Sequence, residues 1–263
     1  MKFKYLIKYY YGHIIQSVSP YRYNPVRYAD SFLTNSDKVT DIPLQNAKEV
    51  IYCFWTGKNE MSYNRKNCVQ SLIDNSGVPV KLITPENLDK YILEEHPLHD
   101  AFQFLSAVHK SDYLRCYFMH FYGGGYSDIK KCENSWLPAF KMLNNSNKWI
   151  LGYGETRKID LAVVEGNVGI DLGRHFLSVI GNCSYICRPR TSFTNEWYTE
   201  LLVRMDNYQQ ELALFPGNIW GDNEGYPIPW TNILGSIFHP LCLKYRDQLM
   251  PSNIVKPNLR NYR

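Results

Sequence analysis

The stretch SDYLRCYFMHFYGGGYSDIKK, residues 111–131, decides the fold of this chain. Its first half is typical of an amphipathic helix, because apolar residues recur at helical spacing: Leu114, Tyr117, Phe118 and Phe121. Asp112 and Arg115, three positions apart, share the opposite face of that helix. Gly123-Gly124-Gly125 should end the helix, since glycine adopts the left-handed backbone that most residues avoid. A short strand through Tyr126 and Ser127 then leaves Asp128 at its end.

This order of features indicates a ligand site as well as a packing unit. Ligands bind where the strands of open α/β sheets end, which is the place expected for Asp128. The alternative for Asp112 and Arg115 is an ion pair on a helix surface, worth about 0.3–0.5 kcal/mol. We favour a site because the charged pair, the glycine turn and the strand-end carboxylate occur together.

The pattern S-D-x-L-R followed by Y-G-G-x-Y-x-D resembles the core of the sugar-nucleotide-dependent glycosyltransferases of family 32. That family includes bacterial capsule and lipopolysaccharide transferases, and it is similar at a greater distance to the glucosyltransferase domains of clostridial toxins. The resemblance spans mainly residues 50–132. It implies a hexosyltransferase that moves a sugar from a UDP- or GDP-linked donor to an oligosaccharide or lipid-linked glycan, with retention of anomeric configuration.

The resemblance also implies roles for single residues. Asp112 and Arg115 match the positions that hold the donor's ribose and sugar, and Asp128 matches the first aspartate of a D-x-D motif. Such a motif holds a divalent cation, Mn²⁺ or Mg²⁺, on the diphosphate. We therefore expect Asp112, Arg115 and Asp128 to be catalytic, with Asp128 as the metal ligand. Further donor contacts are expected from the same stretch: Gly124, Tyr126 and Lys130.

Lys130 stands where the second aspartate of D-x-D would be, and this departure leaves two hypotheses open. Either Asp128 binds the cation with help from a distant acid such as Asp222 or Glu224, or Lys130 supplies positive charge itself. We expect a retained cation, because Asp128 would otherwise have little to do. The same departure motivates an alternative function, a non-catalytic protein that binds nucleotide sugars. The 21 tyrosines of the chain motivate another, a carbohydrate-binding protein.

Three more residues are expected to contact the donor. By the resemblance, Trp55 matches a toxin tryptophan that stacks on the nucleotide base, an interaction worth about 1–3 kcal/mol. Trp230 and His239 lie in a proline-rich C-terminal part that closes over the donor in related enzymes. For all three residues, the alternative is packing in the core.

Alternating elements around the central stretch predict the fold class. Residues 50–55 and 78–83 read as buried strands, a helix is expected over 62–73, and another should begin at Thr84-Pro85-Glu86. Later strands are expected at 148–153 and 183–188, with helices at 136–140, from Thr194, and from Thr231 until His239-Pro240 ends it. The polar residues of 160–176 either line an acceptor pocket or are ordinary turn residues. The prediction is an α/β protein of the GT-A type, with a Rossmann-like mixed, mainly parallel sheet flanked by helices.

The length of 263 residues allows one α/β domain with insertions, or at most two small domains. We divide the chain into a basic, aromatic extension (1–45) and a single catalytic domain (46–263). Residues 46–135 form its nucleotide-sugar-binding half and 136–263 its acceptor and lid half. The net charge of +4 suits an anionic nucleotide sugar and does not argue for nucleic acid.

The sequence predicts a cytoplasmic location. It contains no apolar run of transmembrane length, and its first residues do not read as a signal peptide. Seven scattered cysteines fit reduced thiols. A helix over residues 3–15 either attaches the protein to the inner face of an anionic membrane or packs on the domain.

Overall fold

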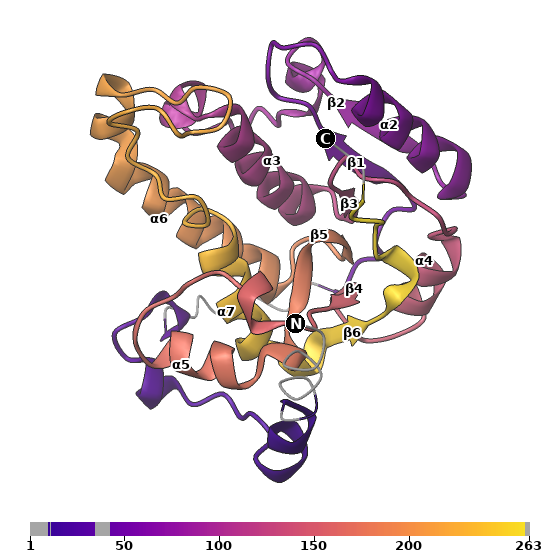
Figure 1. Ribbon diagram of the computed structural model, residues 1–263, viewed down its shortest axis with the longest axis vertical. Coiled ribbons are helices and arrows are strands. Elements are labelled where there is room, and N and C mark those ends of the chain that lie inside the picture. The colour runs from indigo at the N-terminus through magenta and orange to yellow at the C-terminus, as the bar shows by residue number, and fades with distance from the viewer. Residues whose placement is uncertain (1–9, 11, 35–42, 261–263) are drawn as a thin grey trace.

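The computed structural model describes residues 10, 12–34 and 43–260, and a six-stranded sheet lies at its centre (Figure 1). The strands are β1 (Ile51–Phe54), β2 (Val80–Ile83), β3 (Gly124–Ser127), β4 (Ile150–Gly154), β5 (Ile180–Cys187) and β6 (Leu249–Pro251). Their order in the sheet is β2-β1-β3-β5-β4-β6. β5 runs antiparallel to both of its neighbours, and the other pairings are parallel. The predicted mixed, mainly parallel sheet is confirmed.

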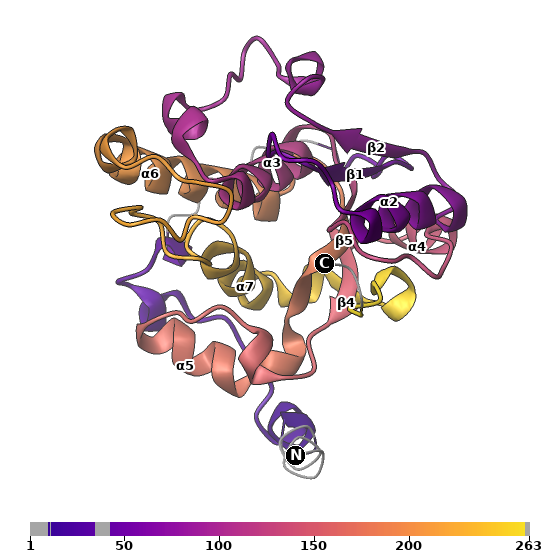
Figure 2. The same ribbon diagram turned by 45° about the horizontal axis from the view of Figure 1, so that its top comes forward.

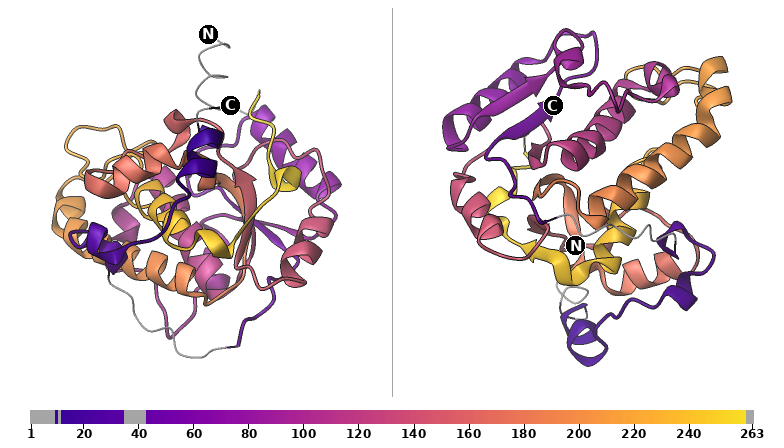
Figure 3. Two further views of the ribbon diagram at one scale, coloured as in Figure 1. Left: turned by 90° about the horizontal axis from the view of Figure 1, so that it is seen from below. Right: turned by 180° about the vertical axis from the view of Figure 1, so that it is seen from behind.

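Helices cover both faces of this sheet (Figures 2 and 3). They are α2 (Tyr63–Asn75), α3 (Ala107–Phe121), α4 (Leu137–Asn144), α5 (Gly166–Arg174), α6 (Ser192–Leu214) and α7 (Gly235–Lys244). Successive strand residues point to opposite faces. Ile51 therefore packs in the cluster that α2 and α4 share, whereas Tyr52 packs in the larger core with α3, α6 and α7.

Short 3-10 turns connect the larger elements. They lie at Pro25–Tyr28, Phe32–Thr34, Leu88–Tyr91, Asp100–Phe104, Lys158–Asp160, Phe176–Ser178, Arg246–Gln248 and Asn253–Val255. Over the described ranges, no helix is both long and apolar enough to cross a bilayer. All seven cysteines are free thiols, and only Cys183 is not buried.

Three predicted helix boundaries are wrong. One is the start of α7, which begins at Gly235 and not at Thr231, because residues 231–234 form a turn. No α-helix begins at Thr84, because the side chain of Asn87 accepts a hydrogen bond from Thr84 N and donates one to Leu82 O. These local bonds close a turn in place of a helix start. Pro240 does not end α7 but lies inside it. Nearly the whole helix is buried, so its packing outweighs the backbone hydrogen bond that proline removes.

The segment before β1 packs against the body of the protein. Tyr21, Tyr28 and Leu33 are buried in the larger core, and Arg27 forms an ion pair with Asp171 of α5 (2.6 Å). Residues 160–176, expected to be pocket or turn residues, thus include a helix that anchors this segment. Residues 10 and 12–15 of the helix expected over 3–15 are helical, and the rest of it lies outside the described residues. The domain boundary at residue 45 stays a prediction.

Candidate functional site

The turn between α3 and β3 positions the candidate site. Gly123, with φ of 62°, directly follows Tyr122, the C-cap residue of α3, and its N–H donates to Phe118 O (3.0 Å). Gly124 has φ of 101°, and a Cβ built on it would lie 3.0 Å from Val50 O. Glycine therefore allows β3 to lie against the chain before β1 and to carry Asp128 to the carboxyl edge of the sheet.

Asp112, Arg115 and Asp128 meet at this edge, as the sequence predicts. Arg115 Nη2 lies 3.0 Å from Asp112 Oδ1 and 3.5 Å from Asp128 Oδ1. The side chains of Asp112 and Arg115 are only 5% and 8% exposed, so they are not a surface ion pair. Asp128 retains 23% exposure and is the accessible member of the group.

Arg115 is held by further contacts that the sequence does not reveal. Its Nη1 donates to Asn182 O on β5 (3.0 Å), and its guanidinium lies 4.3 Å from the centre of the Tyr126 ring. Burial opposes the charge on Arg115, but Tyr126, Asp112 and Asp128 outweigh burial and raise the pKa of the guanidinium. The arginine therefore stays charged while the surrounding protein fixes its orientation.

Asp128 forms a second ion pair with Lys130. Lys130 Nζ lies 2.8 Å from Asp128 Oδ2 and 3.0 Å from Cys183 Sγ, and the Tyr126 hydroxyl donates to Asp128 Oδ1. Burial alone would raise the pKa of Asp128, but Lys130 and Arg115 outweigh it and lower that pKa to about 2. Asp128 is therefore ionised at any physiological pH.

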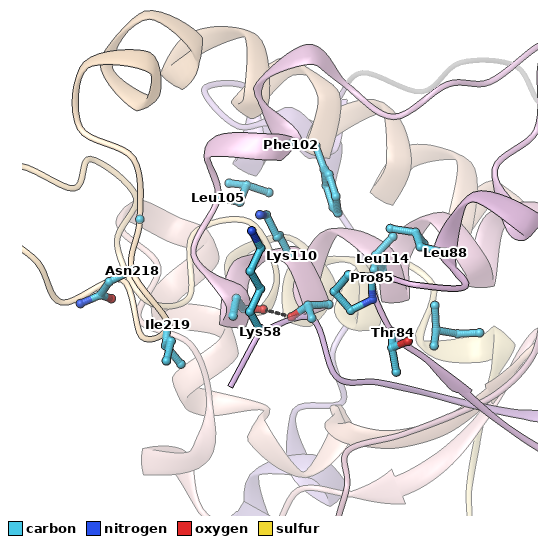
Figure 4. Close-up of a pocket in the computed structure, with 15 residues that line it drawn as sticks. Lys58, Thr84, Pro85, Leu88, Phe102, Leu105, Lys110, Leu114, Asn218 and Ile219 are labelled. Carbon is cyan, nitrogen blue, oxygen red and sulfur yellow. Dashed lines mark hydrogen bonds between the residues drawn. The ribbon is translucent and has the colours of Figure 1, made fainter. Parts of the chain in front are cut away.

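A cavity of about 380 Å³ opens where β1 and β2 end (Figure 4), and its lining includes α3 but none of Asp112, Arg115 and Asp128. Its lining comes from the loops after these strands, from α3 and the segment before it, and from residues 217–219. Phe102, Leu105 and Leu114 give it an apolar wall. Lys58 and Lys110 extend into it together (Figure 4), and burial and then Lys58 lower the pKa of Lys110. Two ammonium groups in an apolar pocket suit a ligand with a flat ring and an anionic part.

Backbone hydrogen bonds fix the rim of this pocket. Ala107 N and Val108 N, at the start of α3, donate to Asn218 O and Ile219 O (both 3.2 Å). Thr56 Oγ1, on the loop after β1, donates to Ala107 O. The loops from both ends of the domain thus meet at the first turn of α3, which also carries Lys110 and leads into Asp112.

Of the other residues predicted to contact the donor, some lie at the cluster and others do not. Gly124 and Tyr126 lie at the cluster, as described above. Trp55 lies outside the pocket lining and packs with the cluster around Cys53 and Cys68, while its Nε1 donates to Asn59 O (2.8 Å). This arrangement agrees with the packing alternative, because Trp55 shares the face of β1 with Cys53 and not with Phe54.

Trp230 and His239 also differ in position. Trp230 is 60% exposed, and its carbonyl lies 3.4 Å from Nε2 of His109, one helical turn before Asp112. His239 is buried in α7, its Nδ1 accepts from Ala162 N (3.0 Å), and burial lowers its pKa to about 4. His239 is therefore a neutral core residue, whereas Trp230 lies near the site.

The residues at Asp128 do not fit a metal held by the protein. Asp128 Oδ2 accepts a hydrogen bond from the Lys130 ammonium, and Asp128 Oδ1 accepts one from the Tyr126 hydroxyl. A divalent cation needs free oxygen ligands. In the described part of the chain, no group of three histidine, cysteine or acidic residues could hold a metal. Asp222 is bonded to Asn218 Nδ2 (2.7 Å) and is not part of this cluster. The divalent cation stays a prediction from the sequence.

Sequence reasoning missed several residues of the site: Lys58, Lys110, Asn182 and Cys183. Lys58 follows the expected end of β1, so the strand-end rule could have found it. Asn182 and Cys183 lie at the start of β5, whose antiparallel direction leaves no mark in the sequence. Glu155 directly follows β4, and burial and then Asp160 raise its pKa to about 7.

Comparisons with known proteins give a family match in the first half of the chain and a structural match over most of it. The family model described as "Capsular polysaccharide synthesis protein" matches residues 22–128. No curated protein sequence matches significantly. Among solved structures, one described as "PaToxG Glycosyltransferase" aligns with 93% of this chain and 79% of its own length, at 14% identity and a TM-score of 0.41.

The family match spans the charged cluster and the end of β3. It supports the resemblance to enzymes of capsule synthesis that the sequence shows around Asp112, Arg115 and Asp128. Residues 22–128 of this chain thus carry the sequence pattern of the capsular polysaccharide synthesis protein family.

Proposed function

We propose that this protein is a glycosyltransferase that moves a hexose from a nucleotide-sugar donor to a glycan or glycolipid acceptor in surface polysaccharide synthesis. One observation carries the proposal. Asp112, Arg115 and Asp128 converge at the carboxyl edge of the sheet, and α3, which carries the first two, also lines the pocket at the carboxyl ends of β1 and β2. The match to a capsular polysaccharide synthesis family supports the choice of pathway.

The two parts of the site suit the two parts of such a donor. The apolar wall around Phe102 and Leu105 suits a nucleoside base, and Lys58 and Lys110 suit the charge of a UDP or GDP diphosphate. The sugar would then lie near Arg115 and the accessible edge of Asp128. A fixed guanidinium and a fixed carboxylate can together orient sugar hydroxyls, because one donates hydrogen bonds and the other accepts them.

Transfer breaks the bond between the anomeric carbon and the phosphate oxygen, and the electron pair stays on the departing diphosphate. The acceptor hydroxyl oxygen forms the new bond, and its proton passes to the departing phosphate. Fixed cations stabilise the negative charge that develops on the departing phosphate oxygen. We include retention of anomeric configuration in the proposal because the family resemblance implies it.

A second candidate is a non-catalytic binder of nucleotide sugars or carbohydrates. The ion pair between Asp128 and Lys130 favours it, since a carboxylate so engaged has less freedom to act on substrate. Both candidates bind the donor, but only the enzyme breaks it down.

A donor screen with the full chain separates these functions. UDP- and GDP-linked sugars are tested for their effect on the melting temperature and for slow hydrolysis without acceptor, with and without Mn²⁺. We expect at least one donor to raise the melting temperature and to be hydrolysed by the wild type. The Asp112→Asn variant should no longer hydrolyse that donor. Asp74→Asn removes an exposed carboxylate on α2 and should change neither. Stabilisation without hydrolysis would favour the binder, and no effect from any donor would contradict both.

A further inference from the structure

The departure at position 130 has a defined geometry in the folded protein. Lys130 lies two residues beyond Asp128 at the end of β3, and its side chain is 9% exposed. Its ammonium contacts both Asp128 Oδ2 and Cys183 Sγ, so β3 and β5 hold it from two sides. A lysine in such a place is part of the interior of the site and not a solvated surface charge.

This ammonium competes directly with a divalent cation for the same carboxylate. A Mg²⁺ ion binds carboxylate oxygen at about 2.0–2.1 Å. The Lys130 ammonium, 2.8 Å from Oδ2, would then face two positive charges at short range within a largely buried site. The other oxygen, Oδ1, accepts from Tyr126 and lies 3.5 Å from Arg115. Both oxygens of Asp128 therefore already have positive or proton-donating partners.

We propose that Lys130 is the built-in cation of this site, and that sugar transfer proceeds without a divalent metal. This inference rests on the proposed glycosyltransferase function. Lys130, fixed by Asp128 and Cys183, acts with Arg115 on the phosphate oxygen that departs with the electron pair of the broken anomeric bond. The acceptor oxygen bonds to the anomeric carbon, and its proton leaves on the nucleoside diphosphate. Charge stabilisation from fixed groups needs no reorganisation at the moment of reaction.

The test combines metal binding and donor hydrolysis in the full chain. The wild type should bind no Mn²⁺ by electron paramagnetic resonance in the absence of donor, and its hydrolysis rate in excess EDTA should equal that with Mn²⁺ within about twofold. Lys130→Gln should lose about 100-fold in rate, because removing one preorganised donor costs about 10²–10³-fold. Added Mn²⁺ should not restore this rate. Lys131→Gln, which removes an exposed lysine that pairs with Glu133, is the matched control and should keep the wild-type rate.

Lys130→Asp provides the converse experiment. Two carboxylates would then lie at the end of β3, so this variant should bind Mn²⁺ and recover hydrolysis with Mn²⁺ but not in EDTA. The proposal is overturned if the wild type binds Mn²⁺ through Asp128, as shown by loss of binding in Asp128→Asn, or if its hydrolysis stops in EDTA and returns with Mn²⁺.

These outcomes are distinct from failure of the proposed function. If no nucleotide sugar binds or is hydrolysed with or without metal, the glycosyltransferase function fails. Metal binding by the wild type and by Lys130→Asp is measured without donor. This measurement therefore still decides whether the Lys130 ammonium occupies the position of a divalent metal ion.

Discussion

Arg115 connects the largest number of groups in the site through one guanidinium. It contacts Asp112 on its own helix, the Tyr126 ring and Asp128 on and directly after β3, and Asn182 on β5. Its Nε is buried and has no hydrogen-bond partner among the described residues. A buried donor without a hydrogen-bond partner costs stability.

Removing this charge should therefore destabilise the fold. In Arg115→Met, Asp112 and Asp128 would face each other without compensation, and breaking a buried ion pair in this way costs about 3–5 kcal/mol. Adding Asp112→Asn should recover part of the loss. Urea unfolding at neutral pH measures both effects. Arg157→Met, which breaks an exposed pair with Asp160, should cost at most about 1 kcal/mol, and an equal cost at both positions would contradict this account.

Glu155 should make stability depend on pH. Its pKa rises from 4.5 to about 7 on folding, first through burial, so the folded protein retains a proton that the unfolded chain releases. The stabilisation from this proton is complete below pH 4.5 and is lost as the pH rises through 7. Glu155→Gln should thus match the wild type near pH 4.5 and exceed it at pH 8, by on the order of 2 kcal/mol.

Denaturant unfolding of both proteins at several pH values measures this difference. Glu95→Gln, at an exposed position, should show no change with pH relative to the wild type. A stability gain of Glu155→Gln that is the same at pH 5 and pH 8 would contradict the raised pKa.

At the scale of elements, the turn into β3 decides where Asp128 lies. Gly124→Ala should destabilise the protein by about 2 kcal/mol, because alanine is strained at φ of 101° and its Cβ would approach Val50 O. Donor hydrolysis should fall as well, since β3 carries Asp128. Gly154→Ala, at the end of β4, meets no atom within 4 Å and should be nearly neutral. Thermal unfolding and the hydrolysis assay together test this prediction, and tolerance of Gly124→Ala would contradict it.

The elements themselves follow from local patterns where those patterns stand alone. The helix, glycine turn and strand of residues 111–128 could be predicted because periodicity and glycine chemistry agree there. The turn at Thr84 could not be predicted, because the side-chain amide of Asn87 bonds to Thr84 N and Leu82 O and so prevents the helix start that Thr84-Pro85 indicates. Pro240 led to a wrong prediction of the end of α7, because the burial that keeps this helix intact depends on tertiary packing. The direction of β5 is also set by its partners and not by its own residues.

At the scale of the whole molecule, the segment before β1 shares one core with the rest. Leu33→Ala should therefore lower the stability of the entire protein by about 2–5 kcal/mol in a single unfolding transition. Val26→Ala, at a position 83% exposed, should change it by less than about 0.5 kcal/mol. Circular dichroism and tryptophan fluorescence should report the same midpoint. A separate early transition would show that residues 12–34 unfold independently.

The candidate site could be predicted in part, for a physical reason. Asp112, Arg115 and Asp128 lie on one helix and the strand that follows it, so local geometry brings them together. Trp55 illustrates the limit, because the face of β1 that it occupies depends on the packing of α2. The pocket brings Lys110 together with residues 217–219, which are distant in sequence. No local sequence pattern predicts that contact.

The reversed direction of β5 has one more consequence. Its beginning, not its end, lies beside the end of β3, so the connection from α5 arrives where Asn182 and Cys183 contact Arg115 and Lys130. That connection therefore borders the ionic cluster, whereas none of its residues lines the pocket at the ends of β1 and β2.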